Sequence, residues 1–293
     1  MRFSVVGPAL ITAILLAGAT LTYRRLRPRP AAWVLTSLTL MVTLAMVWAV
    51  GLFALAFAVQ HPWLASHADW CHHLGVHHRH VPVPLGVAAW GVLVLMGGSV
   101  LRQLKAQRRD RARAEGASEL QVVPQSTPTA FVLPGRPGRI VVSAGMLRAL
   151  DVEERRVLLA HERSHLDRHH HRFIGLADLA ASALPLLRPV QRHIRFAVER
   201  WADEDAAAVV GDRRLVARAL SRAAVASAPS TSAAVAFGHL GVIARVDALL
   251  HPQESPVWLR SSAVVAGILA VSIGLGGSSL QLHHFVEFAA HLC

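Results

Sequence analysis

Four stretches of the chain are apolar and contain no Asp, Glu, Lys or Arg over a length that can cross a membrane. They are residues 3–21, 31–59, 84–101 and 261–280. A helix needs about 17–25 predominantly apolar residues to cross the hydrocarbon core of a bilayer. The pattern therefore predicts a mostly α-helical membrane protein with four transmembrane helices. It divides the chain into an N-terminal membrane region (1–101), a domain (102–260) and a C-terminal membrane segment (261–293).

The segment between the third and fourth predicted spans is long enough for one compact domain. Within it, short apolar runs at 129–132 and 140–143 flank a turn rich in Gly and Pro (134–138), which predicts a β-hairpin. An exposed edge there could bind an extended substrate by β-augmentation, or the hairpin could be purely structural. A further apolar patch, 173–187, is short for a span and is interrupted by an acid and a proline. We expect it to form a core helix or a helix that rests on the membrane.

The distribution of charge predicts how the chain is oriented. The sequence has 30 Lys and Arg against 18 Asp and Glu, a formal net charge of +12, and 53% hydrophobic residues, which excludes a disordered chain. The basic residues gather between the first two predicted spans (24–29) and directly after the third (102–113). Loops rich in Lys and Arg face the cytoplasm. The domain at 102–260 is therefore predicted to be cytoplasmic, whereas the N-terminus, the loop at 60–83 and the C-terminus face outside. Because the charge marks topology beside the lipid bilayer, we expect no direct binding of nucleic acid.

A cleaved signal peptide is the alternative to the first span. Ala17-Gly18-Ala19 resembles a signal-peptide cleavage site. Cleavage there would leave the basic cluster at 24–29 outside the membrane, against the charge rule, so we favour the span.

The residues with the clearest chemistry lie in the segment 152–171, VEERRVLLAHERSHLDRHHH. Its apolar positions fall at helical spacing, and Glu153 and Glu154 suit the first turn of a helix. His161-Glu162-x-x-His165 places two imidazoles four residues apart, on one face of that helix. They could bind one zinc ion, with Glu162 beside them to take a proton from water. The motif alone is also compatible with an exposed, charged helix.

A catalytic zinc needs a third protein ligand. Glu199 and Asp203 are four residues apart in a second helical run, 198–206. One carboxylate could bind the metal while the other orients a histidine N–H. A solvated acidic face is the alternative, and it suffices for Glu204 and Asp205, which we assign no role.

These motifs together resemble the BlaR/MecR-type membrane zinc peptidases, relatives of the HtpX-type gluzincins. The resemblance rests on the strands at 129–131 and 140–147, on E-x-x-x-x-L-x-H-E-x-x-H at 154–165 and on E-x-x-x-D at 199–203. It implies a cytoplasmic α+β gluzincin-like domain in a bacterial plasma membrane. It also implies the site roles: one Zn²⁺ per chain bound by His161, His165 and Glu199, Glu162 as the general base, and Asp203 behind a ligand. The substrate it implies is a polypeptide, for example a transcriptional repressor.

The chain departs from the β-lactam-sensing members of that family. Those members carry a penicillin-binding domain after the last span, whereas here about a dozen residues follow the fourth. The chain also has no S-x-x-K motif, which requires a serine three residues before a lysine. Its only lysine is Lys105, and the residue three positions before it is Arg102. We therefore expect no penicillin-binding sensor in this chain.

Several other polar residues have more than one interpretation. The loop at 60–83 holds seven His between 61 and 80, which could bind an external metal, although a polar loop that protonates near pH 6 is the simpler view. Cys71 and Cys293 are both predicted outside and could form a disulfide bond.

His169, His170 and His171 could line the cleft, but a solvated helix end is favoured. The only tyrosine is Tyr23, so a side chain that stabilises the oxyanion would be His or Arg; the candidates near Glu199 are His193, Arg195 and Arg200.

The leading hypothesis is a membrane-embedded, zinc-dependent endopeptidase with a cytoplasmic active site, which cleaves a repressor in a signalling response. One alternative is a protease for quality control of membrane proteins. Another is a non-enzymatic metal receptor or transporter that uses the His-rich loop. Against the last, the predicted spans carry none of the ionisable residues that line ion paths.

Overall fold

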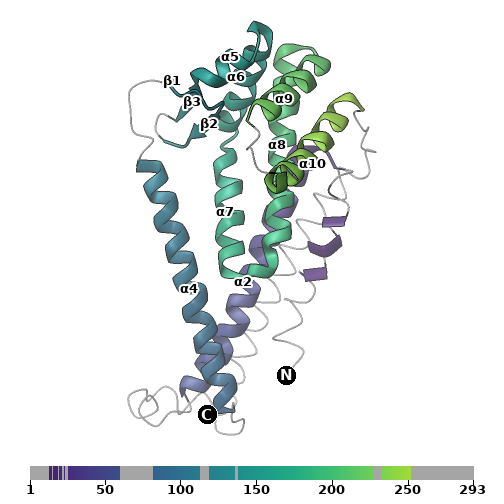
Figure 1. Cartoon of the computed structure of the whole chain (residues 1–293). Coiled ribbons are helices and arrows are strands. Elements are labelled where there is room, and N and C mark those ends of the chain that lie inside the picture. Colours follow the sequence, from purple (N-terminus) through teal and green to yellow (C-terminus); the bar gives the residue numbers. More distant parts are fainter. Residues whose placement is uncertain are drawn as a thin grey trace.

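The computed structural model describes residues 13–59 apart from 15, 19, 22, 24 and 25, together with 82–112, 119–135, 138–227 and 232–251. Most of the predicted span 3–21, nearly all of the His-rich loop, the predicted span 261–280, Cys71 and Cys293 lie outside the described residues. The described helices and strands, in chain order, are α2 (Pro28–Val59), α4 (Val83–Ala112), β1 (Leu120–Val123), β2 (Ala130–Leu133), β3 (Arg139–Ser143), α5 (Ala144–Ala149), α6 (Val152–Asp167), α7 (His170–Ala183), η4 (Pro185–Leu187), α8 (Arg188–Val210), α9 (Arg213–Ala226) and α10 (Ser232–Leu250). The fold is mostly helical, as predicted (Figure 1).

Two of these helices, α2 and α4, coincide with the second and third predicted spans. Their segments Pro28–Leu55 and Val83–Arg109 are long and apolar enough to cross a membrane. The apolar side chains of α4 are largely exposed: 68% of Val94 and 71% of Leu95 are open to the surroundings. This exposure differs from that of a core helix in a soluble protein, which buries its apolar residues. Beyond the predicted span, α4 continues into the basic cluster without a break.

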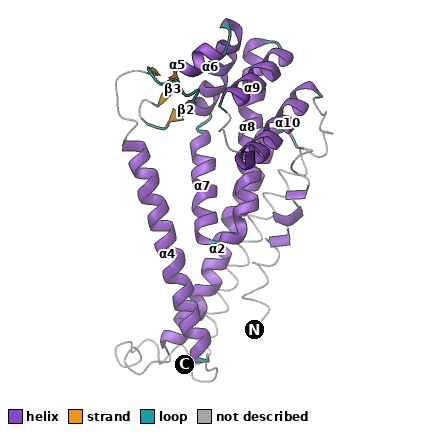
Figure 2. Cartoon of the chain, viewed as in Figure 1, coloured by secondary structure: helices purple, strands orange, loops and turns teal. Residues whose placement is uncertain are grey.

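A small sheet, with strand order β1-β3-β2, lies beside α5 and α6 (Figure 2). The predicted hairpin is confirmed, because β2 pairs antiparallel with β3 and Phe131 faces Val141 in the register. The third strand, β1, pairs parallel with β3. All five residues of β3 are buried, since it is the central strand, and β2 forms one edge of the sheet.

Local hydrogen bonds set where α5 and α6 begin. The Ser143 hydroxyl accepts from Met146 N at the start of α5. Asp151 and Glu154 form a capping box at the start of α6, in which each side chain accepts from the other residue's backbone N–H. The buried carboxylate of Glu154 is further paired with Arg222 at 2.9 Å, which attaches α6 to α9. The zinc-motif helix predicted from the periodicity is thus confirmed, and its first turn is held in place by tertiary contacts.

The patch at 173–187 forms α7 and the short turn η4, and α8 then returns to make a helical hairpin (Figure 1). The hairpin packs against both α2 and α4. Buried residues of α8 recur at helical spacing, which gives one continuous apolar face. They are Val190, Ile194, Ala197, Val198 and Trp201, and they share one core with Leu35, Leu38, Phe173 and Ala177. The prediction of a core helix is therefore confirmed.

Candidate metal centre

Helices α6 and α8 bring together three side chains that could bind a metal ion, from segments more than thirty residues apart. One atom each of His161, His165 and Glu199 lies within 4.8 Å of the others. The two imidazole Nε2 atoms are 3.2 Å apart. Glu199 Oε2 lies 3.5 Å from His161 Nε2, and Glu199 Oε1 lies 3.7 Å from His165 Nε2.

These separations fit a tetrahedral zinc site. With metal–ligand bonds of about 2.0–2.1 Å, two ligands of a tetrahedral ion lie about 3.3 Å apart. The three distances given above lie within about half an ångström of that value. Two neutral imidazoles and a carboxylate are also a ligand set that zinc accepts, with a fourth position left for water or substrate. We call His161, His165 and Glu199 the metal group.

Asp203 lies directly behind the metal group. Its Oδ1 is 3.1 Å from His161 Nδ1, and its side chain is only 4% exposed. This contact holds the imidazole from the side opposite to Nε2. The position expected for Asp203 from its spacing, one turn after Glu199 on α8, is the position the structure gives it.

Arg245 on α10 completes the charged cluster, and the sequence interpretation missed it. Its Nε and Nη2 each lie 2.7 Å from an oxygen of Asp203, a bidentate pair. Its Nη1 is 3.0 Å from Glu199 Oε2, and its side chain is only 12% exposed. The available signal was a single arginine in an otherwise apolar helical run, since α10 holds just one other charged residue, Asp247.

His170 packs against the second imidazole of the metal group. It is fully buried, and its Nδ1 lies 3.1 Å from His165 Nδ1. Its Nε2 has no hydrogen-bond partner among the described residues, and its ring meets Trp201 edge to face at 4.8 Å. The favoured prediction of a solvated helix end for 169–171 is therefore wrong for His170. His169, by contrast, is exposed and adopts a left-handed conformation, φ 53°, which turns the chain from α6 into α7.

The surrounding charges give the two histidines of the metal group very different pKa values. Burial alone would lower the pKa of His161, but its hydrogen bonds to Asp203 and Glu199 raise it to about 10. Burial lowers the pKa of His165 to about 4, helped by the charge of His161. Burial likewise lowers the pKa of His170 to about 3. In the absence of a metal, His161 thus carries a proton at neutral pH and the other two imidazoles do not.

The pKa values of the nearby carboxylates also differ from one another. Burial acts to raise the pKa of Glu199, but the hydrogen bond from His161 and the charge of Arg245 lower it below the ordinary range. Arg245 has the same effect on Asp203, against burial, and lowers its pKa. Glu162 is different, because burial outweighs the charges of His161 and Arg245 near it and raises its pKa. A carboxylate with a raised pKa is suited to accept and return a proton.

The residues considered for oxyanion stabilisation have other contacts. His193 stacks on Tyr23 with ring centroids 4.7 Å apart. Arg195 forms an ion pair with Asp178 at 2.7 Å, inside the α7–α8 hairpin. These contacts do not favour either residue for that role, and Arg200 stays a prediction.

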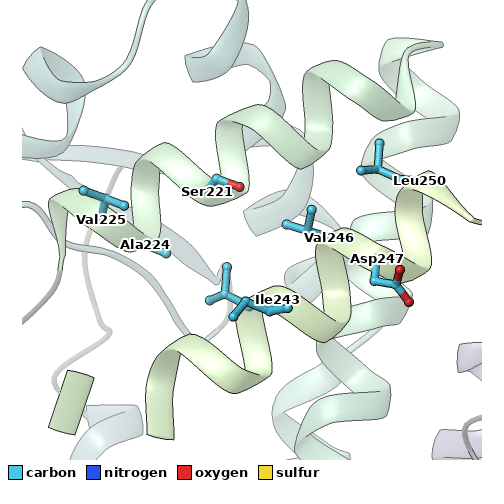
Figure 3. Close-up of a pocket in the computed structure, with 8 residues that line it drawn as sticks. Ser221, Ala224, Val225, Ile243, Val246, Asp247 and Leu250 are labelled. Atoms are coloured by element: carbon cyan, nitrogen blue, oxygen red, sulfur yellow. The ribbon is translucent and has the colours of Figure 1, made fainter. Parts of the chain in front are cut away.

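An apolar pocket of about 320 Å³ lies between α9 and α10 (Figure 3). Its lining comprises Ser221, Ala224, Val225, Val242, Ile243, Val246, Asp247 and Leu250. The lining includes neither the metal group nor Glu162, Asp203 and Arg245. The pocket therefore does not form part of the candidate metal centre.

Comparison with known protein families supports the chemistry of the metal group. A profile of Peptidase family M48 matches residues 99–253, which is just over half of the chain and includes all the residues of the cluster. Neither a search of curated proteins nor a search of solved structures gave a significant match.

Proposed function

This chain belongs to Peptidase family M48, and from that premise we propose that it is a membrane-embedded, zinc-dependent endopeptidase. Membership makes the chain a metallopeptidase, and M48 peptidases depend on zinc. The match is to the family as a whole, so it does not single out the BlaR/MecR type or the HtpX type.

The observation that carries the proposal is the geometry of the metal group beside a buried carboxylate. His161, His165 and Glu199 have the separations that tetrahedral zinc requires, and we assign them as ligands of one zinc ion per chain. Zinc held there supplies Lewis-acid chemistry, which polarises a peptide carbonyl and acidifies water.

Glu162 is the proposed general base. It follows His161 directly on α6, and its buried carboxylate has a raised pKa. Glu162 takes a proton from the attacking water and delivers it to the leaving amine, so the carboxylate is regenerated in each turnover. Asp203 accepts from His161 Nδ1 and holds that ligand, while Arg245 forms ion pairs with both Glu199 and Asp203.

We further propose that the peptidase domain faces the cytoplasm of a bacterium, with α2 and α4 crossing its plasma membrane. The apolar, exposed surface of α4 and the basic residues that follow its apolar part support this placement. The spans proposed at 3–21 and 261–280 would complete a four-helix membrane region. Both termini would then lie outside.

The proposed substrate is a polypeptide that presents an extended segment. The edge strand β2 lies in the same domain, and Phe131 on it is 45% exposed. Cleavage of a transcriptional repressor in a signalling response is the finer proposal. Broad quality control of membrane proteins is its rival. Cleavage of many unfolded proteins by the purified enzyme would favour quality control, and cleavage of one folded protein would favour signalling.

The experiment compares the detergent-purified protein with its Glu162→Gln variant. Wild type should cleave unfolded casein or itself, and a chelator should abolish the cleavage. Glu162→Gln should lower the rate by about 10²–10⁴-fold with zinc still bound, because only the proton transfer is removed. Glu153→Gln, an exposed change on the same helix, is the matched control and should retain the activity.

Undiminished cleavage by Glu162→Gln would remove Glu162 as the base. Loss of zinc binding together with activity would instead show a damaged site. Metal transport that persists in this variant, without any cleavage by wild type, would support the non-enzymatic receptor or transporter.

A further inference from the structure

The hairpin formed by α7 and α8 ends in an apolar tip, of which Pro185 and Leu186 are exposed. The tip consists of Leu184, Pro185, Leu186 and Leu187. Leu187 is buried in the helical core, whereas 90% of Leu186 is exposed. A large aliphatic side chain at such exposure is unfavourable in water, by an amount that grows with its apolar area. One exposed leucine alone requires no explanation, so the position of the tip matters.

The hairpin lies beside both candidate membrane helices, and its tip reaches part-way along α4 (Figures 1 and 2). A hydrogen bond from Gln107 Nε2 to Gly175 O, 3.0 Å, fixes the level of α7 against α4. From Gly175 to Ala183 the helix descends about 12 Å, at 1.5 Å per residue. The antiparallel α4 covers the same distance from Gln107 to Ser99. The tip therefore lies on the apolar side of Arg102, level with the last residues of the apolar part of α4.

Basic residues follow the tip on α8. Arg188 and Arg192 are exposed, and Arg195 is paired with Asp178 inside the hairpin. The sequence contains no acid between Asp178 and Glu199. An apolar tip followed by arginines is the arrangement of segments that enter the boundary between headgroups and acyl chains. Long arginine side chains can reach back to anionic headgroups while their stems stay in the apolar layer.

We propose that the tip of the α7–α8 hairpin inserts into the bilayer leaflet at which the apolar part of α4 ends. Leu186 lies at the boundary of the acyl chains in this arrangement, and Arg188 and Arg192 bind anionic phospholipid headgroups. The inference rests on the membrane embedding proposed above, and it names the lipid surface as the partner of a segment inside the peptidase domain.

The insertion would fix the height of the metal group above the membrane. Glu199 lies on the same continuous helix as the tip, α8, about 16 Å from Arg188 at 1.5 Å per residue. The bilayer then holds one end of the helix that supplies a metal ligand. Substrates would have to present the scissile bond close to the membrane surface.

The test uses the full-length protein in lipid nanodiscs, with Cys71 and Cys293 changed to serine. Single cysteines are introduced at Leu186, at Val94 and at Val225, and each is labelled with a small environment-sensitive fluorophore. Val94 is an exposed residue of α4 and reports membrane embedding, whereas Val225 is a 69% exposed residue of α9 and reports water. Bromine-substituted phospholipids, which quench only fluorophores at acyl depth, are then compared with unmodified ones. Zinc content verifies that each variant is folded.

Strong quenching at Leu186 and Val94, with none at Val225, is the expected result. Quenching at Val94 but not at Leu186 would overturn the insertion of the tip and leave the membrane embedding intact. Absence of quenching at both positions would overturn the membrane embedding itself, and the insertion with it.

The role of the arginines is tested in the same way. Replacing phosphatidylglycerol by phosphatidylcholine should reduce quenching at Leu186, and Arg188→Gln with Arg192→Gln should remove that dependence on lipid charge. Equal quenching at Leu186 in phosphatidylglycerol and in phosphatidylcholine, with Arg188 and Arg192 unchanged, would overturn the headgroup contact.

Discussion

At the scale of single residues, the charges around the metal group balance in the zinc-free protein, and the loss of one proton leaves an excess negative charge for a cation. Two carboxylates with lowered pKa values, Glu199 and Asp203, meet the positive charges of Arg245 and of protonated His161. A zinc ion must replace the proton of His161 to use its Nε2. Metal binding and proton release are thus coupled at this histidine.

The first prediction follows from the sign of that coupling. The pKa of His161 is raised to about 10, so the zinc-free site holds one proton there at pH 7, whereas His165, with a pKa of about 4, holds none. Zinc binding should therefore release about one proton per ion, and the zinc Kd should fall about tenfold for each pH unit from 6 to 9. Calorimetry in two buffers with different ionisation enthalpies measures this release. Asp203→Asn should reduce it, because the carboxylate that raises the pKa of His161 is lost. Zinc binding without proton uptake by the buffer would contradict the assignment.

The second prediction concerns His170. If His165 binds zinc through Nε2, its proton lies on Nδ1 and requires an acceptor, and His170 Nδ1 is the atom at 3.1 Å. His170→Leu removes the acceptor and should weaken zinc binding by about 10–100-fold. His170→Asn has nearly the same shape as the leucine variant and restores an acceptor at the Nδ1 position, so its affinity should stay near that of wild type. Competition with a fluorescent zinc chelator measures both, and equal losses in the two variants would show that only packing matters.

At the scale of elements, α6, α8 and α10 are linked by ion pairs between their charged side chains. Neither α6 nor α8 forms the site alone, since the histidines are on one and the carboxylates on the other. Helix α10 contributes the arginine that offsets the burial of those carboxylates, because a buried charge without a partner is strongly unfavourable. The docking of α10 should therefore depend mainly on Arg245.

The third prediction tests this dependence. Arg245→Met leaves Asp203, only 4% exposed, without its bidentate partner, which should cost about 3–5 kcal/mol in the zinc-free protein. Its thermal midpoint should fall, and amide hydrogen exchange in 241–250 should rise. Arg156→Met, which removes a highly exposed pair with Glu153 at 3.9 Å, should cost less than about 1 kcal/mol. Equal midpoints for the two variants would show that α10 is held by its apolar face instead.

At the scale of the whole molecule, the predicted topology joins a membrane region to a peptidase domain. Helix α4 is continuous from its apolar part into the basic segment, and the α7–α8 hairpin packs along both α2 and α4. Helix α2 and the α7–α8 hairpin therefore share one apolar core. Their relative orientation is consequently a property of the fold.

The fourth prediction concerns that orientation. With both cysteines reduced, a membrane-impermeant maleimide should label Cys71 and Cys293 in intact cells, because the charge rule places both outside. A cysteine introduced at Val225 in the peptidase domain, with the native cysteines changed to serine, should be labelled only after the cells are permeabilised. Labelling of Val225→Cys in intact cells would show that the peptidase domain faces outside, contrary to the proposed topology.

Much of the fold and of the site was predictable because it depends on local patterns. Apolar runs of membrane length predicted α2 and α4, since the bilayer sets that length and no tertiary contact is needed. The spacing of His161 and His165, and of Glu199 and Asp203, predicted two helices with ligands on one face, because the helical repeat alone places residues four apart together. A turn rich in Gly and Pro predicted the β2–β3 hairpin for the same local reason.

What the tertiary structure decided involves contacts between segments far apart in the chain. The contact of Arg245 with Asp203 spans 42 residues, and no spacing rule connects them. The burial of His170 depends on the packing of α7 against Trp201 of α8, whereas its run of three histidines by itself suggests an exposed helix end. The sequence by itself determined which residues can bind zinc and which segments can meet lipid, because both follow from residue chemistry and local periodicity. Only the packing of α6, α7, α8 and α10 decided which side chains surround the metal group and how far the hairpin extends along α4, because burial is a property of the assembled core.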